Sequence, residues 1–75
     1  MNLHGIGDRW LAGEAIPGVS FALHDAVEIT DGEDAGARGA IVLLMMVRPE
    51  PKYLVRLRDG SGDVRVLQSK MRRMK

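Results

Sequence analysis

The chain has 75 residues, no cysteine, and 11 Lys and Arg residues against 10 Asp and Glu residues, for a formal net charge of +1. A chain of this length buries only roughly 60% of its unfolded surface, which permits one small domain and excludes the two-domain cleft of most enzymes. Without cysteine it has no disulfide, thiolate nucleophile or thiolate zinc site, so we expect a soluble, non-catalytic domain without cofactor, metal or small-molecule substrate.

The first part of the chain, residues 1–20, is predicted to be an extension that packs on the rest. Glycine and proline interrupt the sequence so closely that no long helix is expected. The best helical candidate is a single turn over residues 8–12, with Asp8 as its N-cap and Gly13 as its stop. Pro17-Gly18 predicts a type II turn, because glycine accepts the positive φ that follows proline. The segment lacks the features of a signal peptide, which favours a cytoplasmic location.

From Phe21 onward, apolar residues recur with a period of two, which predicts strands. Val27 and Ile29 mark the buried face of the first strand, and a loop is predicted over residues 31–38. Residues 40–47 are apolar at every position, which is typical of a long, bent strand with protein on both faces. This run is far shorter than the roughly 20 residues that a membrane-spanning helix needs, and we expect no membrane partner.

Pro49 and Pro51 end the long strand, because proline cannot donate a hydrogen bond to a neighbouring strand. A hairpin is predicted over residues 53–67, and residues 69–75 could form a final strand, a helical turn or a frayed end. Short strands, tight turns and the lack of a long helix predict an all-β fold. Five strands suit a small barrel better than a sandwich.

The hairpin has two possible registers, which differ in the residue that faces Arg56. If the turn lies at Gly60-Ser61, Arg56 faces Arg65, an unfavourable pair unless an anion lies between the two side chains. If the turn lies at Asp59-Gly60, Arg56 faces Asp63 instead. The register therefore decides whether this face resembles a phosphate site.

Three segments resemble small barrels of a known kind. Residues 21–29, Phe-Ala-Leu-His-Asp-Ala-Val-Glu-Ile, are similar to the opening F-x-x-G-D-x-V-x-I of Src-homology-3-like barrels. Residues 31–42, with Gly39 before the apolar strand, resemble the KOW motif. Residues 53–60 are similar to the third strand and hairpin of such barrels.

The resemblance implies a five-stranded Src-homology-3-like barrel over residues 21–75, with residues 1–20 as an N-terminal extension. It also implies a binding module, because KOW-type barrels bind RNA or protein partners. Related Tudor-like barrels hold methylated side chains in aromatic cages. Here Trp10, Phe21 and Tyr53 are the only aromatic residues, too few to assemble such a cage easily.

Two positions within these similar segments predict unusual backbone geometry. Gly39 lies between a sharp loop and a strand, where a residue without Cβ permits a positive φ or a close approach of two backbones. His24 takes the place of the usual glycine. If that position needs a positive φ, histidine carries a steric cost that glycine avoids.

Charge is unevenly distributed along the chain. Residues 1–37 hold seven acidic residues and one basic residue, whereas residues 38–75 hold ten basic and three acidic residues. Either the two halves attract one another in the folded domain, or the basic half binds an anionic macromolecule such as RNA or a ribonucleoprotein. The residues of this predicted site are Lys52, Arg56, Arg58, Arg65, Arg72 and Arg73, with Lys70 and Lys75 beside them.

The long apolar strand provides an alternative function. One small barrel cannot easily bury both faces of an eight-residue strand. Either residues 1–20 cover the outer face with Ile6, Trp10, Leu11 and Ile16, or a second chain does. In the latter case the chain is an assembly module whose partner is another protein or a second copy. The residues of this predicted interface are Trp10, Met45, Met46, Leu54 and Leu67.

Overall fold

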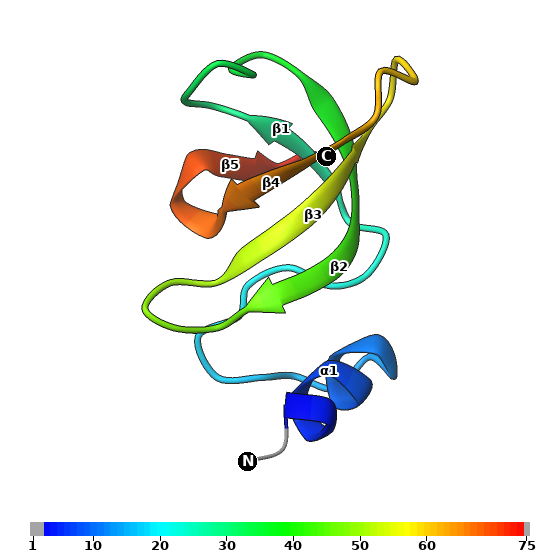
Figure 1. Cartoon of the computed structure of the whole chain (residues 1–75), viewed down its shortest axis with the longest axis vertical. Helices are drawn as coiled ribbons and strands as arrows, with labels where there is room; N and C mark the ends of the chain where they lie inside the picture. The colour runs from blue at the N-terminus through cyan, green and yellow to red at the C-terminus, as the bar shows by residue number, and fades with distance from the viewer. Residues whose placement is uncertain (1–2, 75) are drawn as a thin grey trace.

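The computed structural model describes residues 3–74, and within them the chain forms one α-helix, five strands and one 3-10 helix. The strands form one antiparallel sheet in the order β4-β3-β2-β1-β5 (Figure 1), so the predicted all-β character is confirmed. In chain order the elements are α1 (Leu3–Leu11), β1 (Ala26–Ile29), β2 (Arg38–Met46), β3 (Lys52–Leu57), β4 (Asp63–Leu67), η1 (Gln68–Lys70) and β5 (Met71–Arg73).

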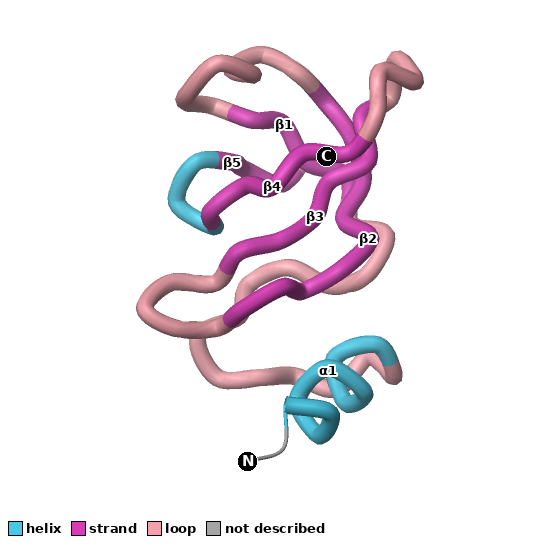
Figure 2. Tube along the Cα trace, viewed as in Figure 1, coloured by secondary structure: helices cyan, strands magenta, loops and turns pink. Residues whose placement is uncertain are grey.

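The sheet is bent, so that its two edge strands come together at one end. Strands β4 and β5 are the first and last in the sheet order, yet only the three residues of η1 separate them in the chain. Figure 2 shows this short connection between the two strands. Of residues 69–75, residues 69–70 belong to this helical turn and residues 71–73 form strand β5; the described part ends at residue 74.

The core is formed by the alternating side chains that point to one face of each strand. Val27, Ile29, Ile41, Tyr53 and Val55 are the large side chains with the least exposure. The strand register brings these side chains into contact; for example, Ile41 lies opposite Val55 on the neighbouring strand. Side chains from the N-terminal segment complete the same cluster, which also contains Trp10, Ile16, Phe21, Leu57, Val66 and Met71.

Helix α1 is longer than predicted: it covers Leu3–Leu11 rather than a single turn over residues 8–12. Gly5 and Gly7 lower the intrinsic helix propensity of this segment. Burial compensates for that loss, because Ile6 and Trp10 are four residues apart on one helix face and both pack against the core. Gly13 follows the helix with φ +90°, in agreement with its predicted role as the stop.

Both predicted turns of the Gly-containing type are confirmed, and the hairpin register is decided. In the first turn Gly18 has φ +83° and Val19 N–H donates to the Ile16 carbonyl at 3.0 Å. In the hairpin, Arg56 lies opposite Asp63, so the register with Asp59-Gly60 in the turn is correct. The register that places Arg56 opposite Arg65 is wrong. The two arginines do not face each other, so their pairing gives no reason to expect a bound anion between them.

Strand β2 is irregular, which explains why its residues 40–46 are apolar at every position. Its pairing with β3 shifts between Ile41 and Leu43 and again between Leu44 and Met46. Each shift inserts one extra residue and bends the strand. The side chains of this strand therefore contact the core, the N-terminal segment and solvent in turn, rather than two opposite buried layers.

Candidate binding surface

The outward faces of β2, β3 and β4 form one surface, which we call the outer face. Residues that lie opposite one another on antiparallel strands point to the same side of the sheet. The register therefore arranges the outer face in three cross-strand rows: Ala40, Arg56 and Asp63; Leu43, Leu54 and Arg65; and Met46, Lys52 and Leu67. It combines five apolar side chains with three basic ones and the acidic Asp63.

Two of the cations on the outer face have no acidic partner within the described part of the chain. Arg56 Nε lies 3.2 Å from Asp63 Oδ1, so this pair neutralises itself. Lys52 and Arg65 form no ion pair with any of residues 3–74. Lys52 lies between Met46 and Leu67 in its row, and a cation among apolar side chains attracts a carboxylate more strongly than one in open water.

The bases near the C-terminus hold strand β5 against β1. Arg72 Nη2 lies 2.7 Å from Glu28 Oε1, and hydrogen bonding and charge attraction from Arg72 lower the pKa of Glu28. Arg73 Nη2 lies 3.0 Å from Asp25 Oδ2. These contacts support the interpretation that the acidic and basic halves of the chain attract one another.

Arg73 makes two further contacts, which leave its guanidinium engaged. It donates to the Ser20 carbonyl at 2.6 Å and lies over the Phe21 ring, 5.4 Å from the ring centre. Lys70, three positions earlier in the chain, has its Nζ 3.6 Å from Asp31 Oδ2. The predicted contribution of Lys75 falls outside residues 3–74.

The six predicted basic residues are thus not brought together in one patch. Arg58 lies beyond the end of β3, where its N–H donates to the Arg38 carbonyl at 2.8 Å. Lys52 begins the same strand, so roughly 20 Å of extended chain separate the two. Arg72 and Arg73 lie on β5, at the other edge of the sheet order. Only Lys52, Arg56 and Arg65 share the outer face.

Four of the five predicted interface residues are accessible, and one is not. Met45 is 39% exposed, and Met46, Leu54 and Leu67 are half-buried. Trp10, in contrast, is only 2% exposed, and its indole Nε1 donates to the Phe21 carbonyl at 2.8 Å. The prediction of Trp10 as an interface residue is therefore corrected: the ring belongs to the core.

The N-terminal segment covers β2 only in part. Ile16 is buried and Ile6 packs against the core, as expected for a covering segment. Leu11 is 47% exposed, contrary to its predicted covering role. Leu43, which sequence reasoning did not single out from the apolar run, is 41% exposed on the outer face.

All three aromatic residues of the chain lie in the core. Trp10, Phe21 and Tyr53 are each less than 9% exposed, and the Phe21 and Tyr53 rings meet edge to face at 5.5 Å. Burial raises the pKa of the Tyr53 hydroxyl. No Trp, Phe or Tyr ring is therefore available on the surface to stack on a nucleic-acid base or to line a cage.

Gln68 is a structural residue that no sequence pattern indicated. Its side-chain oxygen accepts hydrogen bonds from the Tyr53 hydroxyl and from Ser20 N–H, and its Nε2 donates to the Gly18 carbonyl at 3.1 Å. Its own N–H donates to the Pro51 carbonyl at 2.8 Å. One side chain in η1 thereby connects β3 with the segment before β1.

No protein-family model, curated protein or solved structure matches the chain. Within residues 3–74, no three His, Asp or Glu side chains gather closely enough to hold a metal ion. In the same part of the chain, no helix has the length and apolar character needed to cross a membrane.

Proposed function

We propose that this chain is a non-catalytic binding module whose outer face docks an acidic, partly apolar surface of a partner protein. The observation that carries this proposal is the composition of the second and third cross-strand rows. Lys52 and Arg65 have no carboxylate partner among residues 3–74, and they lie beside Leu43, Leu54 and Leu67. A partner with carboxylates opposite the cations would pair these charges and cover the leucines.

An acidic protein surface fits this face better than RNA does. A nucleic-acid backbone would be attracted by the same cations, and RNA or a ribonucleoprotein is the partner expected from the charge pattern alone. Single-stranded RNA is bound chiefly by stacking its bases on exposed aromatic rings, and the Trp, Phe and Tyr rings of this chain are buried. Half of the predicted basic residues, namely Arg56, Arg72 and Arg73, also have carboxylate partners within the chain.

We also propose that the sheet closes into a Src-homology-3-like barrel of the KOW-like kind, located in the cytoplasm. The support is the sheet order β4-β3-β2-β1-β5 together with the three-residue connection between the two edge strands. Closure would protect the free edges of β4 and β5 from pairing with other chains. Gly39, the glycine of the motif, lies where β2 and β3 approach closely.

Site-specific photo-crosslinking tests the proposed docking face. A photoreactive amino acid replaces Leu54, in the middle of the outer face, and the chain is irradiated in a nuclease-treated lysate of its own cells. We expect a protein adduct that disappears when Lys52→Glu and Arg65→Glu are introduced together and weakens as salt is raised. The matched control carries the photoreactive residue at Ala12, in the exposed turn after α1 and outside the rows of the outer face, and should give no such adduct.

Three results would contradict the proposal. An adduct that forms in an untreated lysate but not in the nuclease-treated one would identify the partner as nucleic acid. An adduct of twice the mass of the chain would identify the outer face as a contact between two copies, the alternative assembly function. An adduct that persists unchanged in the double charge variant would show that Lys52 and Arg65 take no part in docking.

A further inference from the structure

A groove opens between α1 and the end of β2. Met46 is the only residue that it shares with the rows of the outer face. Its volume is about 590 Å³, within the range of roughly 300–1,000 Å³ that is typical of small-molecule sites. Ile6 and Ile16 line it on one side, and Leu44, Met45 and Val47 line it on the other. Methionine suits such a wall, because its flexible, polarizable side chain adapts to different apolar shapes.

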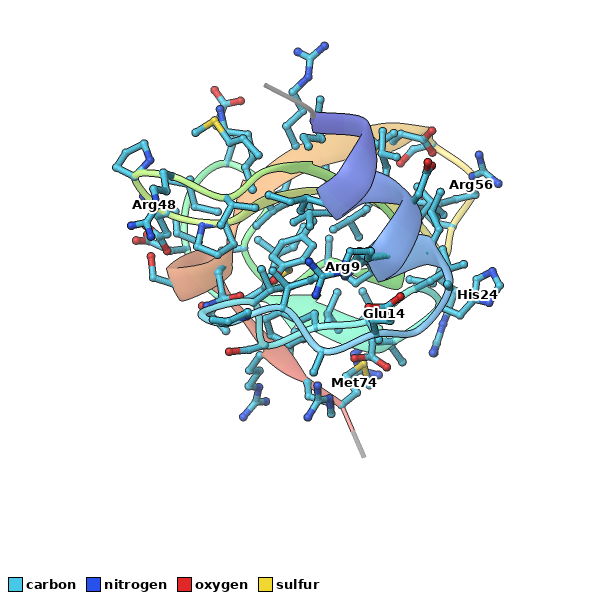
Figure 3. The ribbon with its side chains drawn as sticks, turned by 90° about the horizontal axis from the view of Figure 1, so that it is seen from below. Arg9, Glu14, His24, Arg48, Arg56 and Met74 are labelled. Carbon is cyan, nitrogen blue, oxygen red and sulfur yellow. The ribbon has the colours of Figure 1, made fainter. Side chains whose placement is uncertain are left out.

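Arg48 is the one charged residue that lines this groove. It is exposed and forms no ion pair with any other of residues 3–74. In Figure 3, which looks from the side of α1, Arg48 lies at the periphery, well away from the pair formed by Arg9 and Glu14. The walls of the groove are therefore apolar along most of its length, and Arg48 places one positive charge at one end.

We propose that this groove binds a small amphiphile with one hydrocarbon tail and one carboxylate head, of the class of medium-chain fatty acids. The tail lies along Ile16, Leu44 and Met45, and the carboxylate pairs with the Arg48 guanidinium, which can bind both of its oxygens. A peptide fits less well, because each of its residues brings an N–H and a carbonyl that need partners. Arg48 is the only lining side chain that can form a hydrogen bond.

Titration with decanoate, below the concentration at which it forms micelles, tests this proposal by NMR on the ¹⁵N-labelled chain. We expect saturable shifts of the amides of Ile6, Ile16 and residues 44–48. Octanoate should bind about tenfold more weakly, because it buries two fewer CH₂ groups. The Arg48→Gln variant should bind decanoate about tenfold more weakly and decanol unchanged, since only the former has a charge to pair.

Two variants serve as controls, and both should bind decanoate as the native chain does. Arg58→Gln removes another exposed arginine with no ion-pair partner among residues 3–74, at a distant point of the sheet. The variant Arg65→Glu reverses an unpaired cation of the outer face whose cross-strand row does not include Met46, so the groove and the docking proposal are tested independently. The dispersion of the amide spectrum confirms that each variant is folded.

Four results would overturn the proposal. One is the absence of saturable binding. Another is an equal affinity of Arg48→Gln and the native chain for decanoate. A third is equally tight binding of decyltrimethylammonium, whose head group carries the opposite charge. The last is a shift of the groove amides with protein concentration alone, which would identify a second copy of the chain as the occupant.

Discussion

Gly39 lies where strands β2 and β3 approach each other closely. Glycine is needed there because a side chain would not fit between the two strands. A Cβ at this position would clash with the Arg56 carbonyl oxygen and would lie 2.9 Å from Val55 Cγ1. Since the first of these atoms belongs to the backbone, a rotamer change cannot relieve the contact. Of the two explanations that the sequence left open, close backbone approach is therefore the correct one, and positive φ is not involved.

The Gly39→Ala variant should lose about 2–3 kcal/mol of unfolding free energy, because β2 and β3 must separate to admit a methyl group. Chemical denaturation followed by circular dichroism measures this loss. The matched control is Gly7→Ala, in α1, where a Cβ meets nothing within 4 Å. It should instead gain up to about 1 kcal/mol from helix propensity. A neutral Gly39→Ala variant would contradict the close approach.

His24 is the one non-glycine residue with a positive φ among residues 3–74, at +75°. Its N–H donates to the Ile41 carbonyl at 2.8 Å, which fixes the turn before β1. The steric cost expected from the missing glycine is therefore present in the fold.

Replacing His24 with glycine should raise the unfolding free energy by about 0.5 kcal/mol. Relief of the left-handed conformation, about 1–2 kcal/mol, exceeds the extra entropy that glycine gives the unfolded chain, about 0.4–1 kcal/mol. Thermal and urea unfolding would both register the gain. His24→Ala keeps a Cβ at the same φ and should show no gain, and an equal gain in both variants would refute this explanation.

At the scale of elements, η1 is short but joins several parts of the fold through Gln68. The Tyr53 hydroxyl is buried against it, and Ser20 N–H shares the same acceptor oxygen. Loss of this side chain would remove the acceptor of the buried Tyr53 O–H, and an unpaired buried donor costs more than the bond itself contributes.

We expect Gln68→Ala to lower the unfolding free energy by about 2 kcal/mol. Tyr53→Phe should cost less in the Gln68→Ala background than in the native chain, with a coupling of about 1 kcal/mol. A double-mutant cycle by urea denaturation gives this value. Ser61→Ala, in the exposed hairpin loop, is the control and should be neutral; additive effects of the first two changes would rule out the link.

Local patterns predicted the strands well and the N-terminal helix poorly. The period of two and the glycine-containing turns are local signals, and they identified the strand that holds Val27 and Ile29 and the turn at Gly18. Helix α1 depends on the burial of Trp10 against Phe21, eleven positions away, and no local signal reports such a contact. The sequence of the hairpin is compatible with two registers, and the pairing of Arg56 with Asp63 in the structure selects one of them.

At the scale of the whole molecule, the separation of charge along the sequence becomes pairing in space. Glu28, Asp25 and Asp31 of the acidic half pair with Arg72, Arg73 and Lys70 of the basic half. Composition could predict this attraction in general, but not which bases remain unpaired. That depends on side-chain geometry: β5 lies beside β1, whereas Lys52 and Arg65 border the same hollow as Asp31 without forming an ion pair with it.

Stability should fall in acid, in part through Glu28. Arg72 holds the pKa of Glu28 below its ordinary value of 4.5, so its contribution is complete above pH 4.5 and is lost as the pH falls through the lowered pKa. Glu28→Gln should lower Tm at pH 7, and the difference from the native chain should close at acid pH. Glu33→Gln, with no ion pair within residues 3–74, is the control. A difference independent of pH would contradict this role.

The pairing of β1 with β5 has a mechanical consequence. Val27 lies opposite Arg73 and Ile29 lies opposite Met71, so the chain enters and leaves this ladder at the same end. A force that pulls the two flanks apart would load one hydrogen bond at a time and unzip the pair, rather than shear all of its bonds together. The domain would therefore yield to weak tension, and the loss of β5 would be the first step.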